Sequence, residues 1–249
     1  MVQRAAAWIF LTAMLALAQM PSAAPGAVGM SAERLEQAAA ILASQVKEKQ
    51  LEAAAIVVAR HGKIVLDRAF GNLAGEGSRP VRTDSIFLLA SIAKPVTACA
   101  LMLLVERGLV SLSDPVSQYL PGFTGGNRDR VRVRDLLSHT SGLPDMLPEN
   151  TDLRRAHAPL SAFVEGALKT PLLYTPREGF QYQSMGILLA GEIVERVSGM
   201  RLRDFEQKEI FEPLGMKNSA LGMKPGWKIA DTVRVFEGAS ANSENNLRF

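Results

Sequence analysis

Ser91 and Lys94 stand three residues apart at the start of an apolar segment. On a helix, residues i and i+3 share a face with Cβ atoms about 5–6 Å apart, so the Lys94 amine can reach the Ser91 hydroxyl. The helix N-terminus adds positive potential that favours an oxyanion forming there. Apolar surroundings also make a charged lysine costly, which favours a neutral amine able to accept the serine proton. This spacing predicts acyl transfer by a serine nucleophile without histidine.

The Ser-x-x-Lys string is weak by itself. A chain with 17 serines and 9 lysines in 249 residues contains about 0.6 such strings by chance. Ser44 and Lys47 form a second one, but late in a predicted amphipathic helix, where both are expected on the solvated surface. At Ser91 the alternative is a helix-capping serine followed by a lysine that extends into solvent.

The segment after Ser91 must position these two groups. It is apolar nearly all round, which predicts a helix over residues 91–107 that is buried on most sides. Pro95 fits the first turn, where a missing N–H costs little, and Gly108 ends the helix. Cys99, the only cysteine of the chain, is expected to fill core space rather than act as a nucleophile, and it rules out an internal disulfide.

The remaining patterns predict a mixed α and β chain. Ser31 is a plausible N-cap for an amphipathic helix over residues 32–48. Two β-rich runs follow, separated by His61-Gly62, which is typical of a hairpin turn. The expected elements are strands at 54–60 and 63–70, a short segment at 131–137, helices near 160–169, 184–197 and 201–211, and a weak strand at 232–236.

Composition indicates an ordinary globular protein, with 47% apolar residues, 21% charged residues and a net charge of +3. Nothing in it favours a nucleic-acid partner. Arg4, an apolar run over 5–18 and a small-residue stretch ending at Ala24 together predict a signal peptide over residues 1–24. The alternative, a membrane anchor, needs an apolar run of about 20 residues. We therefore expect an exported protein, periplasmic or secreted, with residues 25–249 forming one domain.

Several segments together resemble the β-lactamase-related serine hydrolases, which include class C β-lactamases, D-alanyl-D-alanine carboxypeptidases and related esterases. The similarity covers residues 31–220 and its segments occur in family order. They are Gly62-Lys-Ile-Val65 with Ala69-Phe-Gly71, Ser91-Ile-Ala-Lys94, Leu112-Ser-Asp-Pro-Val116 with Tyr119-Leu-Pro121, Val133-Arg-Asp-Leu-Leu-Ser-His-Thr-Ser-Gly-Leu-Pro144, and Pro213-Leu-Gly-Met216.

The resemblance implies roles for further residues. The family's second motif is Tyr-x-Asn, in which Tyr moves the nucleophile's proton and Asn contacts substrate. Tyr182 occupies the first position and Ser184 replaces Asn, so β-lactam binding is less expected than acylation. Arg177 stands after Pro176 where the family usually has Pro-Gly. His139 invites a Ser-His interpretation, but the resemblance assigns it a structural duty in a packed loop.

The third family motif, Lys-Thr-Gly or His-x-Gly on a strand that lines the site, does not occur after Tyr182. The resemblance therefore implies an α+β, β-lactamase/transpeptidase-like fold, with an antiparallel sheet flanked by helices, a helical lobe, and the C-terminal strands missing. The site is expected between sheet and lobe. Loss of one oxyanion-hole donor would cost about 10²–10³ in rate.

These inferences give a serine hydrolase with Ser91, Lys94 and Tyr182 as catalytic residues and Ser184 as a substrate-binding residue. It would act by an acyl-enzyme on amide, lactam or ester bonds of a small-molecule or peptide substrate, with cell-wall peptides among the candidates. No cofactor or metal is implied, because no ligand cluster accompanies the three histidines. Two alternatives stay open: a non-catalytic relative that binds peptidoglycan-like peptides, and a truncated product without activity. The substrate and the oligomeric state are left undecided.

Overall fold

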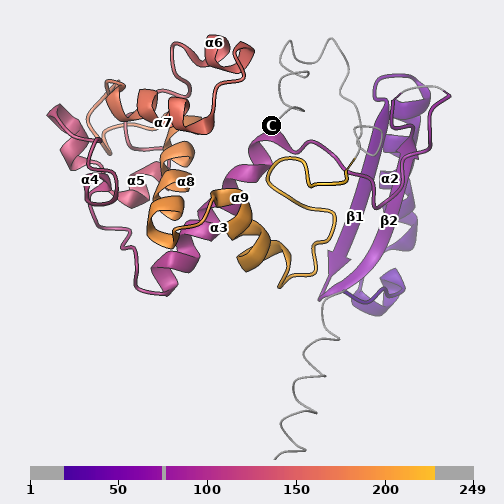
Figure 1. The fold of residues 1–249 in the computed structure, drawn as a ribbon. Helices are drawn as coiled ribbons and strands as arrows, with labels where there is room; N and C mark the ends of the chain where they lie inside the picture. Colours follow the sequence, from indigo (N-terminus) through magenta and orange to yellow (C-terminus); the bar gives the residue numbers. More distant parts are fainter. Residues whose placement is uncertain (1–19, 75–76, 228–249) are drawn as a thin grey trace, which may run out of the picture. The chain divides into compact units, whose positions relative to one another are not determined.

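The computed structural model describes residues 20–74 and 77–227 (Figure 1). Its helices and strands follow the chain in this order: η1 (Pro25–Val28), α2 (Ala32–Lys47), β1 (Ala53–Arg60), β2 (Lys63–Gly71), η2 (Ala90–Ile92), α3 (Ala93–Glu106), α4 (Val116–Tyr119), η3 (Gly126–Arg130), α5 (Val133–Leu137), α6 (Asn150–Arg155), α7 (Leu160–Lys169), α8 (Ser184–Ser198), α9 (Leu202–Glu206) and the π-helical turn η4 (Gln207–Phe211). Among these residues no helix combines the length and the apolar character needed to cross a membrane.

The chain divides into two compact units. Of the described residues, the hairpin unit contains 20–74, 77–88, Glu212–Ser219 and 223–227. The helical unit contains Leu89–Phe211 and Ala220–Gly222. The predicted strand at 232–236 lies outside the described residues.

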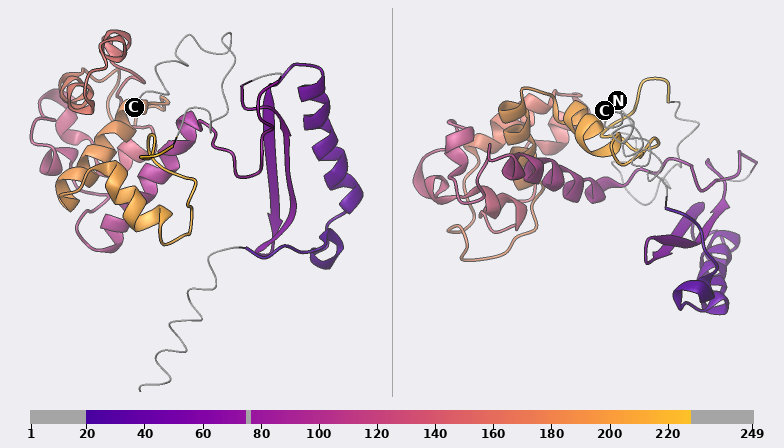
Figure 2. Two further views of the ribbon diagram at one scale, coloured as in Figure 1. Left: turned by 45° about the vertical axis from the view of Figure 1, so that its right-hand side comes forward. Right: turned by 90° about the horizontal axis from the view of Figure 1, so that it is seen from below.

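The hairpin unit is built on the antiparallel pair β1 and β2, with Ala53 opposite Gly71 and a register irregularity at Val58/Ala59. His61 and Gly62 join the strands with φ values of 52° and 71°, the left-handed conformation that tight hairpin turns require. Helix α2 packs on the hairpin (Figures 1 and 2) and buries Leu35 and Ala39 against Leu66. The predicted helix, strands and turn of this region are confirmed to within one residue.

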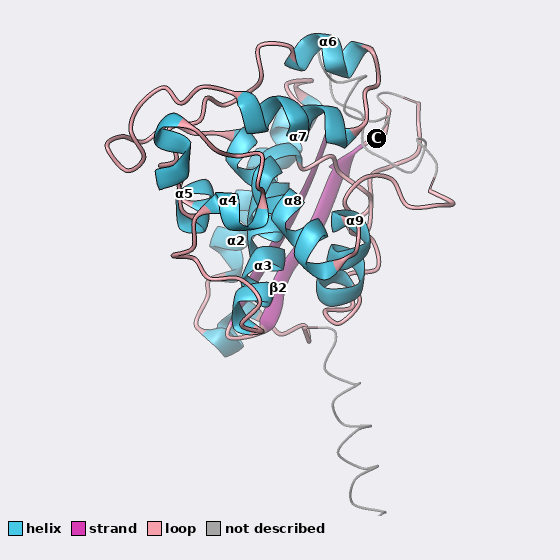
Figure 3. Ribbon diagram, turned by 60° about the vertical axis from the view of Figure 1, so that its left-hand side comes forward, coloured by secondary structure: helices cyan, strands magenta, loops and turns pink. Residues whose placement is uncertain are grey.

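The helical unit is organised around α8, which contacts α3, α4, α5, α7 and α9 (Figure 3). The core between α8 and α3 is aliphatic, with Leu189 and Ile193 on one side and Leu101 and Leu104 on the other, all fully buried. The helices predicted at 160–169 and 184–197 are confirmed. The one predicted near 201–211 is also helical, and its second half differs only in type, because α9 ends at Glu206 and the π-helical turn η4 continues directly from it.

Helix α3 differs from its prediction in one respect. It ends before Gly108 as expected, but it is not buried on most sides, because α8 and α9 cover only one face. Ile92 and Met102 are 62% and 41% exposed, and Cys99 lies exposed between them at helical spacing. The prediction that Cys99 fills core space was therefore wrong. Its apolar neighbours in sequence lie on other faces of the helix.

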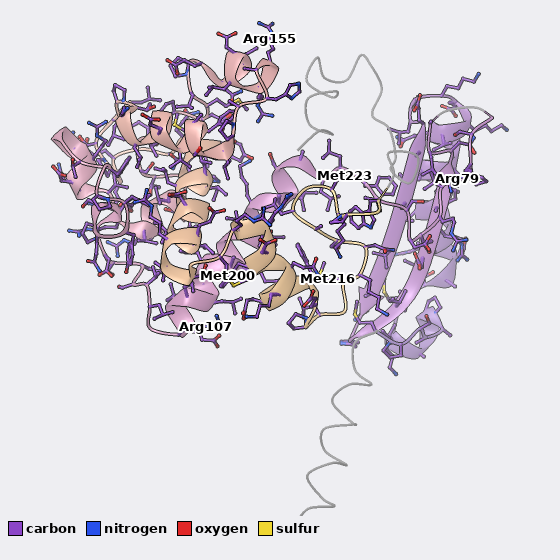
Figure 4. All side chains as sticks on the ribbon, viewed as in Figure 1. Arg79, Arg107, Arg155, Met200, Met216 and Met223 are labelled. Carbon is purple, nitrogen blue, oxygen red and sulfur yellow. The ribbon has the colours of Figure 1, made fainter. Side chains whose placement is uncertain are left out.

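A buried carboxyl group joins α3 to α9. Glu206 is 1% exposed, and its Oε1 accepts a hydrogen bond from Thr97 Oγ1 at 2.9 Å. Burial raises the pKa of Glu206 to about 7, and the bond from Thr97 opposes this only in part. A second, solvated link joins the far end of α3 to η4, where Arg107 pairs with Glu209 (Figure 4 labels Arg107).

Glu206 makes the stability of the helical unit depend on pH. Between pH 4.5 and about pH 7 the carboxyl ionises in the unfolded chain but keeps its proton in the folded one. The folded state therefore loses stability as pH rises through that window, by about 3 kcal/mol in all, and the loss is complete above it. Glu206→Gln keeps an acceptor for Thr97 and cannot ionise. We expect it to match the parent chain in urea unfolding at pH 4 and to be about 3 kcal/mol more stable at pH 8. An equal difference at both pH values would contradict this.

Candidate functional site

The site begins at a strained backbone position. Ala90 has φ 46°, a left-handed conformation that costs a residue with a side chain about 1–2 kcal/mol. It turns the chain into the single 3-10 turn η2, and α3 continues directly from that turn. Ser91 is the middle residue of η2 and is exposed. The strain places the Ser91 hydroxyl at the open end of α3, facing solvent.

Three predicted residues meet at this point. The Lys94 Nζ donates a hydrogen bond to Ser91 Oγ at 3.0 Å, one helical turn along the chain. Tyr182 lies beside both groups, where Lys94 and Ser91 act on its hydroxyl, and Lys94 Nζ lies 4.9 Å from the centroid of its ring. Tyr182 is 41% exposed. Ser91, Lys94 and Tyr182 therefore contact one another, and the exposed Ser91 and Tyr182 side chains are accessible to a ligand.

The electrostatics of this group favour proton transfer. Lys94 contributes most to lowering the pKa of the Tyr182 hydroxyl, and Ser91 lowers it further. Burial and the charge of Asp145 act in the opposite direction but are outweighed. A phenolate is thus easier to form at Tyr182 than at an ordinary tyrosine, next to the hydroxyl that must lose its proton.

Tyr182 is held by the residue that follows it. Gln183 is fully buried, its Oε1 accepts from the Ser141 hydroxyl at 2.7 Å, and its amide Nε2 donates to the Asp135 carbonyl at 3.4 Å. Ser184 begins α8, and its backbone N–H donates to Asp145 Oδ1 at 2.7 Å. These bonds fix the segment that enters α8, and with it the position of the Tyr182 ring.

The fourth predicted site residue is placed differently. Ser184 is half-buried, and among the described residues no hydrogen bond connects its hydroxyl with Ser91, Lys94 or Tyr182. Its anchoring contact runs through its backbone to Asp145. The role of Ser184 in binding a substrate therefore stays a prediction.

Arg177 departs from the family's glycine in a way that the structure explains. Its φ of 73° is the left-handed conformation that glycine adopts without strain. The arginine side chain donates to Asp135 Oδ2 at 2.6 Å and to the Arg130 carbonyl at 3.2 Å, while its backbone N–H donates to the Thr140 carbonyl at 2.8 Å. Asp135 is 1% exposed, so Arg177 supplies the counter-charge of a buried carboxylate. The ion pair offsets the backbone strain.

Three supporting residues were missed from the sequence: Asp135, Asp145 and Gln183. Arg177 was noted there only as a departure from the usual Pro-Gly, with no role. One signal was available for Asp135, which stands among Val133, Leu136 and Leu137, where an acidic residue needs a partner if it is buried. Asp145 and Gln183 carry no local pattern. His61 and His157 are exposed, at left-handed turn positions with φ 52° and 49°. The described residues contain no group of three side chains arranged to hold a metal ion.

Comparison with known proteins decides the family. Residues 38–239 match the sequence profile of the Beta-lactamase family, which is most of the chain. The chain belongs to the Beta-lactamase family. The similarity expected from the Ser91, Tyr182 and 133–144 segments is thereby confirmed, and so is the β-lactamase/transpeptidase-like fold.

The curated relatives of this Beta-lactamase family chain include an esterase and a penicillin-binding protein. Over 196 residues it is 35% identical to "Esterase EstB" of Burkholderia gladioli, covering 72% of this chain and 49% of the esterase. It is 36% identical over 169 residues to "Penicillin-binding protein 4*" of Bacillus subtilis, covering 66% of this chain and 37% of that protein. The chain thus spans about half the length, or less, of the curated relatives it matches.

Solved structures of the family resemble the described fold. The hydrolase EstCE1, described as having promiscuous acyltransferase activity, superposes with a TM-score of 0.70 at 25% identity, covering 81% of this chain and 56% of that one. The D-amino acid amidase of Ochrobactrum anthropi SV3 superposes with a TM-score of 0.69 at 27% identity, covering 80% and 55%. The proteins that this Beta-lactamase family chain resembles therefore include ones named for ester and amide chemistry.

Proposed function

We propose that the chain is a serine hydrolase that forms an acyl-enzyme at Ser91. The observation that supports this most directly is the 3.0 Å hydrogen bond from Lys94 Nζ to Ser91 Oγ, with the Tyr182 ring centroid 4.9 Å from the same Nζ. The substrate is an ester, an amide or a lactam. This range follows from the esterase, penicillin-binding protein and amidase among the relatives.

The reaction follows from the positions of the three groups. The Ser91 hydroxyl passes its proton to the Tyr182 oxygen or to the Lys94 nitrogen, and its own oxygen attacks the substrate carbonyl carbon. The carbonyl electron pair moves to oxygen, and the backbone N–H of Ser91 donates to that oxyanion. Collapse of the adduct breaks the bond to the alcohol or amine, which takes up the proton. Water then hydrolyses the Ser91 ester and restores the free hydroxyl.

The test is covalent labelling of Ser91. The purified chain is incubated with a fluorescent penicillin and, separately, with a reactive phosphonate ester, and the adduct is mapped by mass spectrometry. We expect an adduct at Ser91 that Ser91→Ala abolishes. Ser44→Ala is the matched control, because Ser44 belongs to the second Ser-x-x-Lys string, on α2. This variant should label like the parent chain.

The outcomes separate the candidate functions. A phosphonate adduct without a penicillin adduct supports an esterase or amidase, in keeping with Ser184 in place of Asn. Reversible binding of a peptidoglycan-like peptide by a folded chain that forms no adduct would support the non-catalytic alternative. Folding is checked by circular dichroism in each case.

We further infer that the N-terminal segment directs export to the periplasm or the medium, on the basis of Arg4, the apolar run at 5–18 and the small residues up to Ala24. The structure bears on where the cut falls. The Pro21 carbonyl accepts from the Ile64 N–H, and the Ala23 N–H donates to the Ile64 carbonyl, both at 2.9 Å. A cut after Ala24 removes these two bonds, whereas a cut before Pro21 keeps them. The N-terminus of the exported chain, read by mass spectrometry, distinguishes the two, and an uncut cytoplasmic chain would contradict export.

A further inference from the structure

His139 accepts hydrogen bonds from the backbone N–H groups of the residues on both sides of Tyr182. The His139 carbonyl accepts a hydrogen bond from the Gln181 N–H at 3.0 Å. Its ring Nδ1 accepts from the Gln183 N–H at 3.2 Å. The residues immediately before and after Tyr182 are therefore both tied to one residue of the loop that follows α5.

The imidazole also contacts the Tyr182 side chain itself. The two ring centroids are 4.8 Å apart with an interplanar angle of 40°. On another side, Phe180 meets the imidazole edge-on at 5.9 Å. Three points of contact, two through the backbone and one through the rings, leave Tyr182 little freedom to move away from Ser91 and Lys94.

His139 adopts a backbone conformation that suits this task and few other residues. Its φ is 60°, in the left-handed region, where Asn, Asp and His are the side chains most often found after glycine. The conformation points both the carbonyl and the ring at the segment before α8. The position therefore depends on the residue type, which gives a mutational test.

The bond to Gln183 fixes the protonation state of the ring. Because Nδ1 accepts, the single proton of the neutral imidazole is on Nε2, and a second proton on Nδ1 would face the Gln183 N–H donor. The titratable groups around the ring are Lys94 on α3, Tyr182 before α8, and Asp145 on the same loop. Burial lowers the pKa of His139 and the charge of Lys94 lowers it further, whereas the Gln183 backbone and the charge of Asp145 raise it; the net shift is downward. This shift favours the neutral imidazole.

We propose that His139 is a positioning residue for Tyr182, which in its neutral form clamps the Gln181–Gln183 segment and on protonation releases the Gln183 N–H. This rests on the proposed acylation of Ser91 and adds a residue to it that transfers no proton to substrate. Acid then slows acylation through loss of Tyr182 positioning, in addition to any effect on the reacting groups.

The test uses a pair of matched substitutions. His139→Asn keeps the left-handed backbone, can offer an amide oxygen to the Gln183 N–H, and cannot take up a proton. His61→Asn is its control, since His61 has φ 52° in the exposed hairpin turn of the other unit. The rate of Ser91 labelling by the phosphonate ester is measured from pH 4.5 to 8.5 for both variants and the parent chain. In parallel, heteronuclear NMR follows the His139 ring and the Gln181 and Gln183 amides over the same range.

We expect the labelling rate of His61→Asn to follow the same pH profile as that of the parent chain. His139→Asn should label about tenfold more slowly at pH 8, because the ring contact is lost and a small displacement of a reacting group is costly. It should also lose the part of the acid decline whose midpoint lies below pH 6.5, the ordinary histidine value. In the parent chain the Gln183 amide shift should titrate together with the His139 ring. An unchanged acid decline in His139→Asn, or a Gln183 amide that does not follow the ring, would overturn the proposal.

Failure of the proposed function gives a different pattern. If the folded parent chain is labelled at no pH, acylation of Ser91 is wrong, and the NMR measurement decides the clamp alone. A Gln183 amide that titrates with His139 then supports the clamp, and one that does not overturns it.

Discussion

Lys94→Met is expected to slow the labelling of Ser91 by about 10²–10⁴-fold, the range that general acid–base groups usually contribute. Methionine keeps most of the length and the apolar stem of lysine but removes the nitrogen that donates to Ser91 Oγ. It also removes the group that chiefly lowers the pKa of Tyr182. Both routes for the serine proton are therefore weakened by one substitution. The measurement is the second-order rate of phosphonate labelling at pH 8, with adduct mass as the readout.

The chain provides its own control for this experiment. Lys47→Met changes the lysine of the other Ser-x-x-Lys string, on the surface of α2, and should leave the labelling rate within a factor of two of the parent, about 0.4 kcal/mol in barrier. A Lys94→Met chain that labels at the parent rate would show that Lys94 only occupies space beside Ser91. Equal losses in both variants would indicate a general effect of removing charge.

The contact between Ser91 and Lys94 could be predicted from the sequence because its geometry is local. Ser91 and Lys94 share a helix face, so their contact depends only on helix formation at that point. Helix α2, the hairpin and helix α7 were predicted for the same reason, since caps, turns and periodicity act within a few residues. Tyr182 required more, because residues 91 and 182 meet only through packing of α8 on α3. The family resemblance supplied that link.

The hydrogen bonds that hold the segment around Tyr182 could not be predicted in the same way. Arg177 and Gln183 both donate hydrogen bonds to Asp135, which lies more than 40 residues earlier in the chain. All three have polar side chains, which local patterns favour on the surface. The exposed face of α3 was mispredicted for a related reason. The apolar composition of a helix shows how much of its surface can be buried. How much is actually buried depends on how many neighbouring helices cover it.

The ion pair of Arg177 with Asp135 is the part of this network whose loss should cost most in stability. Removing one partner of a buried pair typically costs about 3–5 kcal/mol, because the other charge is left without compensation. Asp135 Oδ2 would keep the Arg132 N–H at 2.8 Å, and the Arg177 side chain is itself partly solvated. We therefore expect Arg177→Ala to lower the free energy of unfolding by about 2–3 kcal/mol.

Arg177→Gly separates the side chain from the backbone. Glycine loses the same ion pair but removes the strain of a side chain at φ 73°, so it should be less destabilising than alanine by about 1 kcal/mol. Arg155→Ala is the control, because Arg155 forms an exposed pair with Asp152 on α6 and should change stability by less than about 0.5 kcal/mol. The measurement is urea unfolding followed by circular dichroism at a helix wavelength, which reports mainly on the helical unit.

The order of the three variants tests the explanation for arginine at a glycine position. If alanine costs more than glycine and both cost more than Arg155→Ala, the side chain is retained for its pairing with Asp135 in spite of the backbone strain. A glycine variant as stable as the parent chain would mean that the ion pair only offsets the strain that the arginine itself introduces. In that case the family's glycine and this chain's arginine would be equivalent solutions to the same turn between the His139 loop and Tyr182.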